Sequence, residues 1–136
     1  MFMSELLPVS LLALVAGTVA HMGIGMAWFS PMLFGDHWLA LTKIKRGSLK
    51  MDERHIIGSA LIGATLTLVL GYLLSALGAT TCLEAIKFAL ILWIGFVATT
   101  HFSPVLWEKR PLALYALCSA YWAVDLLVIS CIVTKW

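Results

Sequence analysis

Four long apolar stretches constrain this chain of 136 residues more than any other feature. Each is close to the ~20 residues that an α-helix needs to cross the hydrocarbon core of a bilayer. Hydrophobic residues make up 62% of the chain and charged residues 12%, and a water-soluble globule of this size has too little interior to enclose that much apolar surface. We therefore predict an all-α polytopic membrane protein, a single four-helix transmembrane domain over residues 1–136. Its predicted spans are residues 6–29, 56–79, 83–102 and 112–134.

Lysine and arginine are distributed unevenly between the loops. Seven of the nine lie in residues 30–55 and 103–111, which follow the first and third spans. Because cytoplasmic loops carry an excess of basic residues, we expect both loops in the cytoplasm and both termini outside. The net charge of +2 gives no reason to expect a nucleic-acid partner.

The first and third spans end in a shared pattern, F-S-P-x-L followed by an aromatic residue. It begins at Phe29 and again at Phe102, 73 positions later. Proline disfavours helix at the residue before it, so we expect these spans to end near Ser30 and Ser103. The repeat predicts two parallel helical hairpins related by a twofold axis along the membrane normal; the alternative is two unrelated helix ends. The residues expected at the membrane interface are Trp28, Pro31, Trp38, Pro104 and Trp107.

The first cytoplasmic loop has the pattern of a short amphipathic helix. We expect Asp36 to cap this helix and Gly47 to end it, with Trp38 turned toward lipid. An ordinary solvated basic loop is the alternative. Asp52 is expected to cap the second span. The residues expected to reach lipid headgroups are Lys43, Lys45 and Arg46.

Small residues spaced by four form an unbroken stripe along the second span. Lipid gives helices no hydrophobic reason to associate, so close backbone approach at small residues must hold them together. We expect the stripe to pack against small residues of the first span. It could instead pair with a second copy of the chain, and a homo-oligomer is expected on this ground. The predicted packing residues are Ser59, Gly63, Thr67, Gly71 and Ser75 in the second span and Gly17 and Gly25 in the first.

Ionisable residues inside a membrane are costly and mark candidate functional sites. Counting along the helices places His21 about 10 Å and Asp125 about 20 Å from the inner interface, with Tyr121 and Thr18 one helical turn from them. The four residues suggest a polar track that moves a proton or holds a cation or polar ligand. The alternative is structural, with Asp125 bonded to a neighbouring helix and His21 donating to a backbone carbonyl. An enclosed Asp125 would favour the structural alternative, and one connected to a membrane face would favour transport.

Cofactor and metal sites are not expected. Cys82, Cys118 and Cys131 lack metal-ligand spacing and are interpreted as small buried apolar residues. A haem would need two histidines at one depth, and His21 and His101 lie at different depths. No catalytic motif is recognisable, so we do not expect an enzyme, although a lipid-directed enzyme is a third, weaker hypothesis.

The first span ends in an element that consists of Ala27, Trp28, Phe29, Ser30, Pro31, Phe34 and Gly35, with Trp38 soon after. Farther along the chain come the stretch GFVATTHF, the sequence Glu108-Lys109-Arg110-Pro111 and the pair Tyr121-Trp122. Together they resemble a family of small four-span prokaryotic membrane proteins of unknown function. The resemblance implies four helices in a cytoplasmic membrane and implies no activity.

Two functional hypotheses follow. The first is a small oligomeric transporter or channel-like protein of the prokaryotic inner membrane that acts on a small molecule or ion through Asp125, helped by His21. The second is a non-catalytic structural or accessory membrane protein whose basic cytoplasmic loop binds anionic lipid or a partner.

Overall fold

The computed structural model describes residues 9–48 and 51–136. The start of the predicted first span, residues 6–8, lies outside them. The described residues form helices and no strand, which confirms the all-α prediction. Four helices are long and apolar enough to cross a membrane, one of them continuous from Cys82 to Trp107. The elements are α2 (Leu11–Trp28), α3 (Gly35–Thr42), the 3₁₀ turn η1 (Arg46–Ser48), α4 (Glu53–Ala76), α5 (Cys82–Leu92), the π-helical segment η2 (Trp93–Ala98), α6 (Thr99–Trp107) and α7 (Leu112–Lys135).

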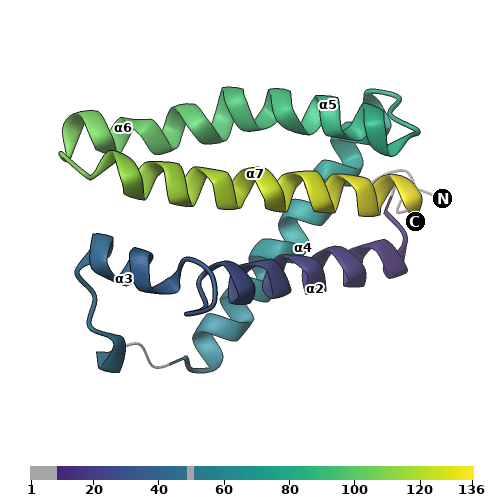
Figure 1. The fold of residues 1–136 in the computed structure, drawn as a ribbon. Helices are drawn as coiled ribbons and strands as arrows, with labels where there is room; N and C mark the ends of the chain where they lie inside the picture. Colours follow the sequence, from purple (N-terminus) through teal and green to yellow (C-terminus); the bar gives the residue numbers. More distant parts are fainter. Residues whose placement is uncertain (1–8, 49–50) are drawn as a thin grey trace.

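The long helices form two antiparallel hairpins that share one bundle (Figure 1). α2 packs mainly against α4, α5 packs mainly against α7, and α7 also contacts α2 and α4. The Ser10 hydroxyl donates to the carbonyl of Trp136, so the start of α2 and the end of α7 meet at one end of the bundle, called the terminal end here. α3 and the turn from α6 to α7 lie at the opposite end, called the basic end because it carries the two basic loops (Figure 1).

Small residues hold α2 against α4, as predicted. A Cβ added to Gly17 of α2 would lie 2.3 Å from Oγ1 of Thr67, and one added to Gly63 of α4 would lie 3.1 Å from Cβ of His21. Gly71 faces Val9 and Val133 in the same way. Most of the stripe is therefore used inside a single chain.

The outer members of the predicted packing set lie elsewhere. Ser75 is exposed, and Ser59 lines a cavity at the basic end. Gly25 lies beside the hydroxyl of Tyr121, which a Cβ there would approach to 3.2 Å. The close contacts of the stripe are therefore confined to its middle, at Gly63, Thr67 and Gly71.

The third long helix does not end near Ser103, as the sequence had suggested, but continues through Pro104 to Trp107. In the first copy of the shared pattern the helix does end, at Trp28, and a tight turn follows: the Gly35 amide donates to the carbonyl of Ser30 at 2.9 Å. A Cβ on Gly35 would lie 2.4 Å from the carbonyl oxygen of Phe29, so this turn requires glycine. The matching position of the second copy is Glu108, whose side chain forbids the same turn. The two copies therefore have different local structures.

The helix in the first basic loop is shorter than predicted. α3 ends at Thr42, because Lys43 adopts a left-handed backbone conformation with φ of 58°. Asp36 lies in the first turn and does not cap the helix; Phe34 is the N-cap and makes no side-chain bond. The Asp36 carboxylate instead accepts a hydrogen bond from Arg46. Lys43, Lys45 and Arg46 are exposed at the basic end, while Lys50 lies outside the described residues.

Cys82 and Cys131 form a disulfide, with their Cα atoms 4.7 Å apart. The interpretation of all three cysteines as isolated buried residues is therefore wrong for two of them, and Cys118 is free. Cys82 begins α5 and Cys131 lies near the end of α7. Antiparallel packing of these helices brings the two residues together at the terminal end.

The predicted cap of the second span is confirmed. The Asp52 carboxylate accepts hydrogen bonds from the amides of Arg54 and His55, and His55 completes a capping box. The hydrogen bond from the His55 side chain, with the bonds from the two amides, holds the pKa of Asp52 below its ordinary value of 3.8.

Asp52→Ala is expected to lower the stability of the protein at neutral pH because the first turn of α4 loses its cap. A lowered pKa means that the cap is fully present above the ordinary pKa and is lost as the pH falls through the folded-state value. The difference between the wild-type protein and Asp52→Ala should therefore shrink below about pH 4. Thermal unfolding of both proteins in detergent across a pH series measures this difference in stability. Asp52→Asn, which caps without titrating, is the control. The difference in stability between Asp52→Asn and Asp52→Ala should therefore persist at low pH.

Candidate functional site

A histidine and a carboxylate meet between α2 and α7. Nδ1 of His21 lies 2.8 Å from Oδ2 of Asp125. The two residues are 3% and 0% exposed, so this hydrogen bond is enclosed by the bundle. We call the two residues the His–Asp pair.

The depths counted along the sequence had placed these residues about 10 Å apart along the bundle axis, and that estimate is wrong. It assumed that both hairpins end at the same plane. α3 extends the first hairpin beyond the end of α2 and packs against the start of α7 (Figure 1). α7 therefore begins farther out than α2 ends, and Asp125 lies level with His21. For the same reason His21 bonds to the carboxylate and not to a backbone carbonyl.

Thr18 does not join the His–Asp pair. Its hydroxyl donates to the carbonyl of Leu14 in its own helix, at 2.7 Å. The second oxygen of Asp125, Oδ1, is buried and has no hydrogen-bond partner among the described residues. The hydrogen bond of the pair persists whether the proton belongs to the imidazole or to the carboxyl, so the pair can hold a proton in two ways.

Aromatic rings cover the His–Asp pair on the side of the basic end. The Trp122 ring stacks on His21 with ring centroids 5.9 Å apart, and the Tyr121 ring lies 6.3 Å from His21. Tyr121 also contacts the rings of Trp28 and Phe29. Trp28, predicted at the membrane interface, is thus half-buried in this cluster, and its indole N–H has no partner among the described residues.

A cavity of about 620 Å³ opens at the basic end and reaches Tyr121. Its walls come from α2, α3, α4 and α7, and we call it the Tyr121 cavity. Neither His21 nor Asp125 lines it, so one aromatic side chain separates the cavity from the pair. Its lining includes Met22, Met26, Phe29, Trp38, Leu39 and Tyr121.

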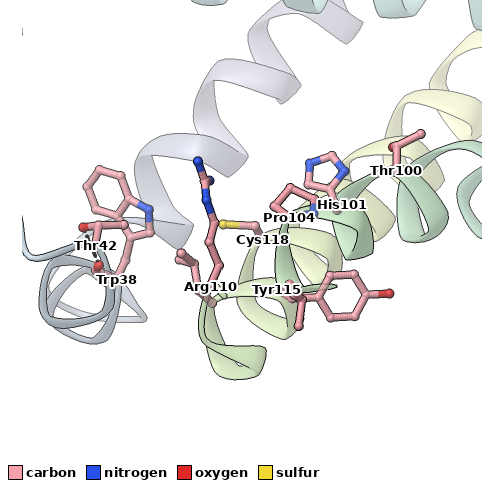
Figure 2. A pocket seen from close by; sticks show the side chains of 10 residues that line it. Trp38, Thr42, Thr100, His101, Pro104, Arg110, Tyr115 and Cys118 are labelled. Carbon is pink, nitrogen blue, oxygen red and sulfur yellow. Dashed lines mark hydrogen bonds between the residues drawn. The ribbon is translucent and has the colours of Figure 1, made fainter. Parts of the chain in front are cut away.

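A second cavity of about 400 Å³ lies on the other side of α3, against α6 and α7. Figure 2 shows the side chain of Arg110 between Trp38 and Cys118. His101, which lines the same cavity, bonds through Nδ1 to the carbonyl of Val97 at 3.0 Å. Trp38 lines both cavities and so forms the wall between them. Pro104 lines the second cavity, Pro31 lines the Tyr121 cavity, and Trp107 is 84% exposed.

No group of three or more His, Cys, Asp or Glu residues suited to a metal ion occurs in the part of the chain that the structure describes. Three of the four carboxylates that the structure describes at the basic end, all except Glu53, are paired with basic side chains. Asp36 pairs with Arg46, Asp52 with His55, and Glu108 with Arg110.

Comparison with known proteins gives one match. Residues 12–134 match a family model described as a protein of unknown function (DUF1761). No curated protein and no solved structure matches the chain.

Proposed function

The chain belongs to the DUF1761 family of proteins of unknown function, and from this premise we propose that it is a small membrane transporter that carries a proton on its His–Asp pair. The observation that carries the proposal is that the Tyr121 cavity opens at the basic end and stops at the Tyr121 ring, which lies beside the His21 ring. Nδ1 of His21 lies 2.8 Å from Oδ2 of Asp125, inside a bundle of helices apolar enough to span a membrane. Ionisable side chains at that depth are costly and are retained mainly on proton and ion pathways.

The arrangement around the pair favours a transporter over an open channel. Asp125 is completely buried, so neither membrane face has direct access to it in this conformation. The Tyr121 cavity approaches from the basic end and stops at Tyr121, which lies against His21. Movement of this one aromatic side chain would connect the pair to the basic end, and a second movement would be needed to reach the terminal end. Access that alternates in this way is what a transporter requires.

A structural role is the second candidate, and the enclosure of Asp125 is the observation named above as favouring it. Asp125 is fully enclosed and bonded to a neighbouring helix, the arrangement that a purely structural carboxyl would have. On that account the His–Asp pair fixes α2 against α7 and holds them in one register.

Proton exchange at the pair separates the two candidates. We expect the carbonyl stretch of the Asp125 carboxyl, followed by infrared spectroscopy after transfer into D₂O, to show exchange within about a second, the slow limit of gating motions. Asp125→Asn identifies the band by removing it. Ser130→Ala removes another buried polar group of α7 and should leave the band unchanged. A shared proton that persists for hours, like the most protected backbone amides, would support the structural candidate.

Proton flux is the functional counterpart of that measurement. Vesicles that contain the protein and a trapped pH-sensitive dye should acidify faster after an acid pulse than vesicles without protein. Asp125→Asn is expected to reduce acidification to the rate of protein-free vesicles, with Ser130→Ala as the folded control. Equal rates for the wild-type protein and Asp125→Asn would remove the pair from the transport mechanism.

The orientation proposed from the basic loops has independent support. The disulfide between Cys82 and Cys131 lies at the terminal end, and disulfides persist in oxidising compartments. We propose that this end faces outward from a prokaryotic inner membrane and that the basic end faces the cytoplasm. There the exposed Lys43, Lys45 and Arg46 would meet anionic lipid. A homo-oligomer would need faces other than the middle of the small-residue stripe, because Gly63, Thr67 and Gly71 are buried within the chain.

A further inference from the structure

The Tyr121 cavity has the size and lining of a site for a small organic molecule. Its volume of about 620 Å³ falls within the ~300–1,000 Å³ range of protein ligand sites. Methionine and aromatic side chains dominate its walls, and methionine adapts its shape to different apolar partners. Met22 is half-buried in the wall, and Met26 is 66% exposed beside it, so this wall of the cavity reaches the outer surface of α2.

Two polar side chains, Tyr121 and Ser59, line this mostly apolar cavity away from its charged mouth. Tyr121 is 6% exposed, and no hydrogen bond joins its hydroxyl to another described residue. The hydroxyl faces Gly25, another residue of the cavity wall, and the absence of a side chain there leaves room for it. The hydroxyl is not among the enclosed polar atoms that lack a partner, so it is reachable from the cavity, and a tyrosine hydroxyl in a largely buried side chain ordinarily has a partner. A ligand that enters the cavity can supply it.

The charged groups at the mouth of the cavity are compensated within the protein. Arg46 is paired with Asp36 and His55 with Asp52. A charged ligand would have to break one of these ion pairs or carry an unpaired charge into an apolar site. The walls therefore suit an uncharged molecule.

We propose that the Tyr121 cavity binds an uncharged lipophilic molecule whose carbonyl or other acceptor oxygen accepts a hydrogen bond from the Tyr121 hydroxyl. The apolar body of the molecule lies against Met22, Met26 and Phe29. This proposal does not rest on proton transport, because the cavity and the hydroxyl are present whether or not the His–Asp pair exchanges its proton.

Benzophenone is a suitable probe because it is uncharged and lipophilic and carries one acceptor carbonyl. On illumination its excited carbonyl reacts preferentially at C–H bonds next to sulfur. We expect irradiation of the purified protein in nanodiscs at a low benzophenone concentration, followed by peptide mass spectrometry, to label Met22 and Met26 several-fold more than Met32. Met32 is 91% exposed and lies outside the cavity, so it reports labelling from the lipid phase alone.

Tyr121→Phe is expected to lower labelling of Met22 by about 3–10-fold, the effect of one hydrogen bond on affinity. The matched control is Tyr72→Phe, which changes a tyrosine that is 52% exposed on α4 and outside the cavity, and it should leave labelling unchanged. Ser59→Phe, which fills the cavity from α4, should reduce labelling of Met22 to the level of Met32.

Two results would overturn the proposal. Equal labelling of Met22 and Met32 in the wild-type protein would mean that benzophenone merely dissolves in the bilayer. Preferential labelling of Met22 that Tyr121→Phe leaves intact would mean that the cavity accepts any lipid tail and that the hydroxyl selects nothing. Neither result depends on Asp125, so the outcome is independent of the test of proton transport.

Discussion

His21→Ala is expected to destabilise the protein by about 3–5 kcal/mol, the effect of removing one partner from a buried ion pair or its neutral equivalent. The change leaves the Asp125 carboxyl fully enclosed with neither oxygen bonded, since Oδ1 already lacks a partner among the described residues. It also removes the ring on which Trp122 stacks. Unfolding in mixed detergent micelles, with increasing denaturing detergent, measures the loss.

Two further variants separate the effect of losing the hydrogen-bonded pair from the effect of losing a histidine side chain. His101→Ala removes a histidine that bonds only to a backbone carbonyl and should cost far less. The double variant His21→Leu, Asp125→Leu removes both polar groups together and should recover most of the lost stability. If His21→Ala is no more harmful than His101→Ala, the bond between His21 and Asp125 does not exist in the folded protein.

Gly17→Leu is expected to cost about 3 kcal/mol, at the upper end of ordinary overpacking. The first added carbon would lie 2.3 Å from Oγ1 and 2.7 Å from Cγ2 of Thr67. Thr67 is 0% exposed, and its hydroxyl donates to the carbonyl of Gly63, so it has no space into which to retreat. α2 and α4 must therefore separate, which weakens contacts along the whole interface.

Gly23→Leu is the matched control for this variant. It lies on the same helix, and an added Cβ there meets nothing within 4 Å. Both substitutions gain the same helix propensity, so the difference between them in the detergent unfolding experiment measures packing alone. Equal stability of Gly17→Leu and Gly23→Leu would show that α2 and α4 do not make this contact.

The helices and their main contact were predictable because they depend on local composition. Apolar length fixes the four spans, the Asp52 carboxylate at a helix start fixes a cap, and small residues spaced by four identify the face of α4 that packs on α2. Each of these signals lies within one helix or at its end. The structure contains four long apolar helices and the Asp52 cap, and it places Gly63 and Thr67 of the stripe against α2.

The His–Asp pair was not predictable as a pair, although both residues were recognised. Depth was counted from Trp28 on one helix and from the start of α7 on the other, as though these positions were level. They are not, because α3 continues past the end of α2. The relative height of two helices is a tertiary property, and no residue count within either helix contains it.

Two other features were missed for different reasons. The turn after α2 needs glycine at position 35, and the second copy of the shared pattern has Glu108 at the matching position. The serine and proline that both copies share therefore do not decide whether the helix ends there. The disulfide follows from antiparallel α5 and α7. Once these helices are taken as neighbours, Cys82 and Cys131 fall at the same end of the bundle. The positions of the two cysteines in the sequence were therefore enough to suggest the disulfide.

The bridge between Cys82 and Cys131 also limits how the second hairpin can change shape. It ties the first residue of α5 to a residue near the end of α7, so these two helices cannot part at the terminal end. If α5 and α7 rotate relative to each other, they move least at the bridge. They move most at the opposite tip of the hairpin, around α6 and the start of α7. The second cavity, lined by α3, α6 and the start of α7, lies at that tip, so a small rotation about the bridge would change its volume.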